Sequence, residues 1–275
     1  MNVIDFKHPN HVFFVGIGGI SMSGLAMILK DRGFTVSGSD MKDSHLLDDL
    51  RARGIEVYIG HEAAHIHQGI DVVVYTAAVK LDNPELQAAQ ALAIPYIERA
   101  VLLGELMANY QKPIAVTGTH GKTTTSSMVT SIFMENPLLP TVSIGGLLDL
   151  IKGNIFIGSN TYFIAEACEY HDSFLHFHPY TSIILNVELD HVDYFKDLQQ
   201  MRTSFRKFIS QTHVDGHVLM HEEIEDIPWL VADYTGKVYT FGMSPTSDFS
   251  GRNGCINSDG QLSYDFYQGE ACLGK

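Results

Sequence analysis

Short apolar runs alternate with helical patterns along the first part of the chain. Three runs have the continuous apolar character of buried strands, at residues 11–17, 34–40 and 71–76. Helical apolar spacing follows at residues 21–33, 44–54, 83–93 and 98–110. This alternation is typical of a parallel sheet built from βαβ units. The polar stretch Gln111-Lys112-Pro113 after the last helix indicates a hinge, so we place a domain boundary near residue 110.

The same order of elements begins again after this hinge. Strands are predicted at residues 113–118, 161–167, 182–187, 216–220 and 237–242, and helices at residues 121–134 and 197–211. From Ser244 to Lys275 the chain is rich in Gly, Ser, Asp and Asn, which is typical of small strands and turns. We therefore predict two α/β domains, residues 1–110 and residues 111–275.

Composition places the chain among globular proteins and excludes several other classes. Its 275 residues are 45% hydrophobic and 18% charged, and this length is enough for two domains. No apolar run approaches the roughly 20 residues that a membrane helix needs. The N-terminus lacks the cationic start and small-residue cleavage site of an export signal. We expect a cytoplasmic protein that does not bind membranes.

Charge and cysteine content narrow the possible partners. The formal net charge of −14 disfavours binding to nucleic acid. The three cysteines form no CxxC pair, so neither a disulfide framework nor a thiolate zinc site is predicted. We expect a monomer or a weak homodimer that binds small anionic molecules through local features.

The stretch "VTGTHGKTTT" at residues 116–125 predicts a phosphate-binding loop between a strand and a helix. Its glycines permit a tight turn in which backbone N–H groups and the helix N-terminus point at one anion. Lys122 would then reach the outer phosphates, and the hydroxyl of Thr123 would bind Mg²⁺. The common pattern GxxxxGK[ST] requires Gly where this chain has Val116, so the match is to a shortened loop, Gly118 to Thr123. The alternative is a plain glycine turn with a solvated lysine.

Two further strand ends carry candidate metal ligands. Glu166 ends the strand "YFIAE", and His191 follows the strand "SIIL" within "NVELDHVDYF". Ligands bind at the carboxyl ends of strands in open α/β sheets, so both should converge on the phosphate loop. Glu166 could hold Mg²⁺ beside Thr123, and His191 could hold a second ion. An ordinary hydrogen-bonded surface histidine remains the alternative for His191.

A second glycine turn, "GIGGISMSG" at residues 16–24, lies between the first strand and the first helix. Gly16 and Gly18 fit a dinucleotide fingerprint, but Ser21 stands where the third glycine belongs. Asp40 closes the second predicted strand. A diphosphate is favoured at such a helix N-terminus. The glycines leave open a nicotinamide dinucleotide, a nucleotide sugar or no ligand, so a nicotinamide-dependent oxidoreductase and a non-catalytic nucleotide-sugar-binding module remain alternative functions.

The stretch "HEAAHIHQG" could place two imidazoles on one helical face, from His61, His65 or His67. No third ligand of fitting spacing is evident, so we expect a solvated face rather than a metal site.

Taken in order, these stretches resemble the Mur ligases of bacterial peptidoglycan synthesis. The resemblance rests on "FVGIGGISMSGLA", "SGSD", "YTAAV", "TGTHGKTTT", "EACEY" and "NVELDH", and it runs through the whole chain. It implies a Rossmann-like parallel-sheet domain at residues 1–110 that binds a UDP-sugar. It also implies a P-loop-type α/β central domain at residues 111–275 that binds ATP. The chain most resembles the members that join L-alanine to UDP-N-acetylmuramate.

The resemblance also implies roles for individual residues. The UDP-sugar would be bound by Gly16, Gly18, Gly19, Ser39 and Asp40. ATP would be bound by Gly118, Thr119, His120, Gly121, Lys122, Thr123, Thr124 and Asn186. The catalytic residues would be Lys122, Glu166 and His191, with Mg²⁺ bound by Thr123, Glu166 and His191. The implied reaction phosphorylates a carboxylate with ATP and then forms an amide with the amine of L-alanine.

The chain departs from the family pattern in three ways. Members commonly carry Asp and Ser where this chain has Cys168 and Tyr170. Several use a carbamylated lysine, whereas the corresponding region near Phe205 has none. The family also has a third, C-terminal domain that closes over ATP, and this sequence ends within what resembles the central domain. We therefore expect a truncated fragment that does not turn over alone.

Overall fold

The computed structural model describes residues 3–275 of the chain. The chain forms two compact units. The first unit contains Met1–Gln111 and Ser127–Ile164, and the second contains Lys112–Ser126 and Ala165–Lys275. Within residues 3–275, no helix has both the length and the apolar character needed to span a bilayer.

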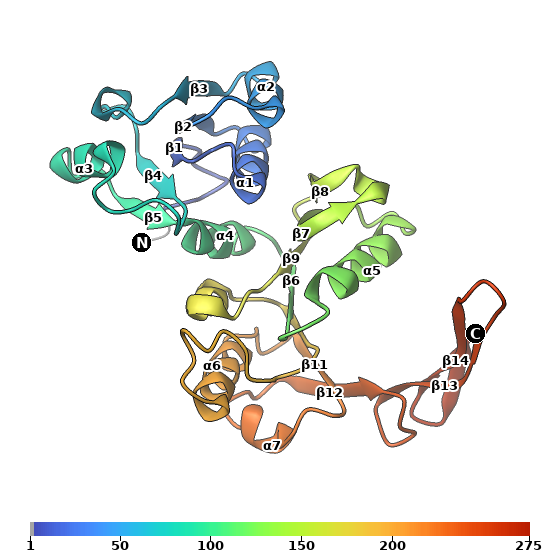
Figure 1. The fold of residues 1–275 in the computed structure, drawn as a ribbon. Helices are drawn as coiled ribbons and strands as arrows, with labels where there is room; N and C mark the ends of the chain where they lie inside the picture. The colour runs from blue at the N-terminus through green and yellow to red at the C-terminus, as the bar shows by residue number, and fades with distance from the viewer. Residues whose placement is uncertain (1–2) are drawn as a thin grey trace. The chain divides into compact units, whose positions relative to one another are not determined.

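A five-stranded parallel sheet forms the centre of the first unit, with the strand order β3-β2-β1-β4-β5. The strands are β1 (His11–Val15), β2 (Thr35–Asp40), β3 (Glu56–Ile59), β4 (Val72–Tyr75) and β5 (Tyr96–Glu98). The connecting helices are α1 (Ile20–Asp31), α2 (His45–Ala52), the 3₁₀ turn η1 (Ala63–His65), α3 (Pro84–Ala91) and α4 (Arg99–Met107). Figure 1 shows α1 and α2 on one side of this sheet and α3 on the other.

The core of this unit follows from the alternation of side chains along β1. Phe13 and Val15 are fully buried and pack with Val73, Leu86 and Ile94 on the face covered by α3. Val12 and Phe14, which point to the opposite face, are also fully buried. A strand buried on both faces reads as a continuous apolar run, which is why the sequence alone predicted β1.

The first unit also contains a small antiparallel pair that the sequence did not predict. It consists of β7 (Thr141–Leu148) and β8 (Gly153–Phe156), joined through the 3₁₀ turn η2 (Asp149–Ile151). Glycines and exposed positions interrupt the apolar pattern there. Short strands β3 and β5 were missed for a related reason, because each has only three or four residues and carries a glutamate.

In the second unit, parallel strands run in the order β12-β11-β10-β6. They are β6 (Lys112–Thr117), β10 (Thr181–Ile184), β11 (His217–His221) and β12 (Lys237–Gly242). Beyond β12 lie β13 (Phe249–Ile256), β14 (Leu262–Gln268) and β15 (Ala271–Gly274), where β13-β14-β15 are antiparallel. Figure 1 shows this last ribbon projecting from β12. The small strands predicted for residues 244–275 are therefore confirmed.

Two elements cross the division between the units, helix α5 (Lys122–Met134) and strand β9 (Tyr162–Glu166). The remaining elements of the second unit are the 3₁₀ segment η3 (Tyr170–His176), α6 (Leu198–Ser210) and α7 (Ile227–Leu230). The predicted fold class, two α/β domains each built on a sheet, is confirmed. The boundary near residue 110 remains a prediction.

Candidate active site

The phosphate loop predicted at residues 118–123 lies between the end of β6 and the start of α5. Gly118 and Gly121 have φ angles of +139° and +84°, values that favour glycine. A Cβ atom at Gly118 would come within 3.0 Å of the backbone nitrogen of Asn186. Glycine is therefore needed at residue 118 for both its conformation and its lack of a side chain.

Hydrogen bonds fix this loop to the segment that follows β10. The N–H of His120 donates to Oδ1 of Asn186 at 2.9 Å, and Nδ2 of Asn186 donates to the His120 carbonyl at 3.1 Å. The hydroxyl of Thr119 donates to the Glu188 carbonyl and accepts from its N–H, at 2.9 and 3.0 Å. The structure thus brings Asn186 to the loop, while Thr124 lies exposed in the first turn of α5, and the predicted binding of ATP by both residues stays a prediction.

Lys122 folds back across the loop rather than extending into solvent. Its Nζ donates to the Gly118 carbonyl at 2.6 Å and to the Glu169 carboxylate at 3.0 and 3.1 Å. The lysine side chain is 18% exposed and that of Glu169 is fully buried. The solvated-lysine alternative is therefore wrong. The sequence did not reveal Glu169 as a site residue, because "EACEY" holds two carboxylates and nothing in it indicates which one reaches the lysine.

Thr123 and Glu166 meet at the same edge of the sheet. The Thr123 hydroxyl donates to Oε2 of Glu166 at 3.1 Å, and the Ser126 hydroxyl donates to Oε1 at 3.1 Å. Glu166 comes into reach because the N–H of Ala167 donates to the Val116 carbonyl, which sets the end of β9 beside β6. The pair offers hard oxygen donors of the kind that Mg²⁺ binds in nucleotide sites, together with phosphate oxygens.

His191, predicted as the ligand of a second metal ion, lies beside the carboxylate that binds Lys122. Its Nε2 is 3.6 Å from Oε1 of Glu169. Among residues 3–275, no group of three or more His, Cys, Asp or Glu side chains is arranged to hold a metal ion. The region near Phe205 lies in the core, since Phe205 is fully buried and packs edge-on against Phe174.

A tyrosine and an aspartate border His191, and the sequence assigned no role to either. The ring of Tyr170 stacks on the His191 imidazole with centroids 4.5 Å apart, and its hydroxyl donates to Oδ2 of Asp193 at 2.5 Å. This hydrogen bond to a carboxylate raises the pKa of Tyr170 and lowers the pKa of Asp193.

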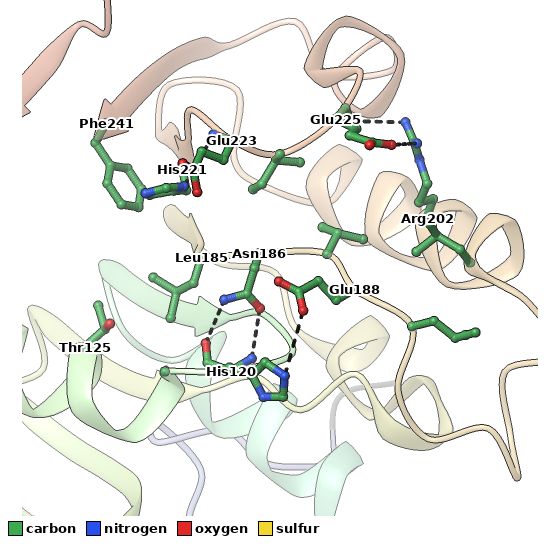
Figure 2. Close-up of a pocket in the computed structure, with 15 residues that line it drawn as sticks. His120, Thr125, Leu185, Asn186, Glu188, Arg202, His221, Glu223, Glu225 and Phe241 are labelled. Carbon is green, nitrogen blue, oxygen red and sulfur yellow. Dashed lines mark hydrogen bonds and ion pairs between the residues drawn. The ribbon is translucent and has the colours of Figure 1, made fainter. Parts of the chain in front are cut away.

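A cavity of about 660 Å³ opens beside the phosphate loop. Its lining residues are His120, Gly121, Thr125, Leu185, Asn186, Val187, Glu188, Leu189, Leu198, Arg202, His221, Glu223, Ile224, Glu225 and Phe241. Figure 2 shows His120 and Asn186 on one side and His221 with Phe241 across the cavity. The His221 and Phe241 rings pack edge to face with centroids 5.4 Å apart. The cavity has the volume of a small-molecule site and combines apolar, aromatic and polar groups.

The glycine turn of the first unit closes on Asp40. Gly16 has a φ of +83°, and Gly19 is the N-cap residue of α1. The N–H of Gly18 donates to Oδ2 of Asp40 at 2.9 Å, and a Cβ atom at Gly18 would come within 2.8 Å of that oxygen. Ser39 lies one residue earlier on β2 and is fully buried, with its hydroxyl donating to Glu85 at 2.7 Å. The Ser39 carbonyl accepts hydrogen bonds from the N–H groups of Gly16 and Ile17 at 2.8 and 2.9 Å, so its backbone holds the turn while its hydroxyl is paired with Glu85.

The histidines that were predicted to form a solvated face include two that bond to Glu85. Its fully buried carboxylate accepts from Nδ1 of His61 and of His65, each at 2.8 Å. Both histidine side chains are only 12% exposed, so the prediction of a solvated face is wrong for these two, whereas His67 is exposed. The partner lies 24 and 20 residues away along the chain, on α3, where local spacing could not reveal it.

Comparisons with known proteins agree with this arrangement. The family description "Mur ligase family, catalytic domain" matches residues 11–111, and "Mur ligase middle domain" matches residues 116–271. The UDP-N-acetylmuramate–L-alanine ligase of Agathobacter rectalis is 51% identical over 253 residues, which are 92% of this chain and 55% of that protein. The enzyme of the same name from Lachnoclostridium phytofermentans is 48% identical, with 96% and 59% covered. The chain thus spans little more than half the length of these curated relatives.

Solved structures show the same fold. A UDP-N-acetylmuramate:L-alanyl-gamma-D-glutamyl-meso-diaminopimelate ligase from Neisseria meningitides has a TM-score of 0.82 at 29% identity, covering 96% of this chain and 86% of that one. A UDP-N-acetylmuramate–alanine ligase from Thermotoga maritima has a TM-score of 0.78 at 29% identity, covering 97% and 59%. These matches confirm the resemblance found in the motifs, and the chain belongs to the Mur ligase family.

Proposed function

We propose that this chain carries the UDP-sugar-binding and ATP-binding parts of a ligase that joins L-alanine to UDP-N-acetylmuramate in peptidoglycan precursor synthesis. The curated relatives that cover it bear the name of that activity. The observation that carries the proposal is the largely buried amine of Lys122 in a glycine loop beside a cavity of about 660 Å³. The nicotinamide-dependent alternative gives this loop no role.

In the second unit, the loop would bind the phosphates of ATP. The adjoining cavity would bind its nucleoside. Gly118 and Gly121 allow the backbone to approach the phosphates, and the N-terminus of α5 favours their charge. Asn186 holds the His120 peptide in place. Lys122 would exchange its contact with Glu169 for the outer phosphates, where it disperses charge on the transferring group.

The residues around Thr123 fit Mg²⁺. Thr123 and Glu166 lie 3.1 Å apart and would hold one ion beside the phosphates, with His191 as the ligand for a second. Such ions supply charge neutralisation on the phosphoryl oxygens. The chain's own contribution is to carry Thr123 on the first turn of α5 after β6, Glu166 at the end of β9 and His191 after β10.

In the first unit, Gly16, Gly18 and Gly19 would approach the diphosphate of the UDP-sugar at the N-terminus of α1. Asp40 accepts a hydrogen bond from the turn, and the Ser39 carbonyl accepts two more. In the proposed reaction, an oxygen of the sugar's carboxylate attacks the γ-phosphorus and ADP leaves. The amine of L-alanine then attacks the acyl carbon, phosphate leaves and the amine loses a proton. We place this chemistry in the cytoplasm.

Thermal-shift measurements on the whole chain test the proposal. A non-hydrolysable ATP analogue with Mg²⁺ and UDP-N-acetylmuramate should each raise the melting temperature, since ligands of the native state stabilise it in proportion to ln(1 + [L]/Kd). NADH should not. Lys122→Met should abolish the ATP-analogue shift but keep the UDP-sugar shift. Lys207→Met, which alters an exposed lysine of α6, is the matched control and should keep both. A folded wild-type chain that shows no shift with the ATP analogue would contradict the proposal.

A further inference from the structure

The backbone that carries His191 is in an unfavourable conformation. His191 has a φ of +51°, in the left-handed region, and His171 and Asp172 share this conformation at +52° and +55°. Residues other than glycine persist there only where surrounding contacts hold them. Contacts within the second unit must therefore hold residues 170–172 and residues 190–194 in this conformation.

Tyr170 makes contacts that do this. Its ring stacks on the imidazole of His191 at 4.5 Å with an angle of 28° between the planes, and its hydroxyl donates to Asp193, two residues further along. The Tyr170 side chain thus contacts the His191 segment at two points. Stacking sets the plane of the imidazole, and the hydroxyl anchor restrains the turn that carries it.

The orientation of His191 matters because of what its ring faces. Nε2 is 3.6 Å from the carboxylate of Glu169, which also binds Nζ of Lys122 at 3.0 Å. Glu169 precedes Tyr170 directly, so the dipeptide Glu169-Tyr170 contacts both Lys122 and His191. In the proposed nucleotide site, an imidazole that turned away could no longer act as the ligand for the second ion beside the terminal phosphates.

We propose that Tyr170 is a positioning residue that holds the imidazole of His191 toward the terminal phosphates of the bound nucleotide. The inference rests on the proposed function, because it concerns the same nucleotide site. Tyr170 itself acts through His191 and Asp193. Its effect should appear with ligands that carry β- and γ-phosphates and not with AMP, which does not extend to that end of the site.

Calorimetry on the whole chain with two ligands tests this. Tyr170→Leu removes both the ring and the hydroxyl, and it should weaken binding of a non-hydrolysable ATP analogue with Mg²⁺ by about fivefold to tenfold, the scale of an aromatic pair. Tyr170→Phe keeps the ring and should recover most of this loss. AMP affinity should stay unchanged in both. Tyr234→Phe, which removes a tyrosine hydroxyl that bonds to the His213 carbonyl elsewhere in the unit, should bind both ligands like wild type.

A second readout does not need a nucleotide. In the ligand-free wild type, ring protons of His191 and Tyr170 should show nuclear Overhauser contacts, and Tyr170→Leu should shift the His191 ring resonances. Equal losses of affinity for AMP and the ATP analogue would assign Tyr170 a merely structural role and overturn the inference. Unchanged His191 resonances in Tyr170→Leu would overturn it as well. A wild type that binds no ATP analogue but shows the expected ring contacts would instead refute the proposed function.

Discussion

The Nζ atom of Lys122 lies 3.0 Å from Oε2 of Glu169, a carboxylate that is fully buried. His191 approaches the same carboxylate from another segment. Glu169 is therefore the counter-charge of Lys122 in the phosphate loop. A buried charge is stable only when it is paired, so the pair constrains both partners.

Removing this counter-charge should destabilise the chain. Glu169→Ala leaves the amine of Lys122 with carbonyl partners only, and we expect the free energy of unfolding to fall by about 3 kcal/mol. Glu169→Gln keeps an oxygen acceptor and should cost less. Urea denaturation followed by circular dichroism measures both. Glu188→Ala is the control, because that side chain is 66% exposed, and it should cost under about 0.5 kcal/mol. A fall no larger than the control's would show that the pair is not stabilising.

Replacing Gly118 should affect both stability and binding. Gly118→Ala forces alanine to a φ of +139° and brings its Cβ to 3.0 Å from the Asn186 nitrogen. We expect a loss of about 1 to 3 kcal/mol and weaker binding of the ATP analogue, because the loop must shift. Gly260→Ala separates strain from crowding, since Gly260 has a φ of +77° with no atom within 4 Å of the new Cβ. That control should cost about 1 kcal/mol and leave nucleotide affinity intact.

The buried carboxylate of Glu85 should contribute to the free energy of unfolding. Glu85 is fully buried and accepts hydrogen bonds from Ser39, His61 and His65. Glu85→Ala leaves these donors without their acceptor and should cost about 3 kcal/mol in urea denaturation. Glu62→Ala, at an exposed position between His61 and His65, should have little effect. Similar stability of the two variants would contradict the role given to Glu85.

Ionisation of Tyr194 should lower the free energy of unfolding at high pH. Its hydroxyl donates to Asp172 at 2.6 Å, and this bond raises the pKa of Tyr194 to about 12, above its usual value of 10.0. Because the folded-state pKa is the higher one, the stabilisation is fully present below pH 10 and is lost as pH rises through about 12. Measured from pH 9 to about 12, wild type should lose more stability than Tyr194→Phe. Tyr264→Phe, at an exposed tyrosine of β14, should follow wild type. Parallel curves for wild type and Tyr194→Phe would refute this.

The sequence predicted those strands, helices and site residues whose pattern lies within a short stretch of the chain. The run 114–117 reads as a strand, and the glycines with Lys122 and Thr123 follow within six residues, so the loop needed no tertiary information. Glu169 was not recognised, because its partner lies 47 residues away and only the approach of β9 to β6 joins them. Glu85 and Tyr170 were missed for the same reason. Their importance lies in burial and in pairs between distant segments, which periodicity does not encode.

Asn186 holds the His120 peptide by both its N–H and its carbonyl. The Asn186 side chain thus fixes the orientation of the amides in this turn. Under the proposed function, this pre-organisation strengthens nucleotide binding, because little conformational entropy is lost in ordering the loop around the phosphates.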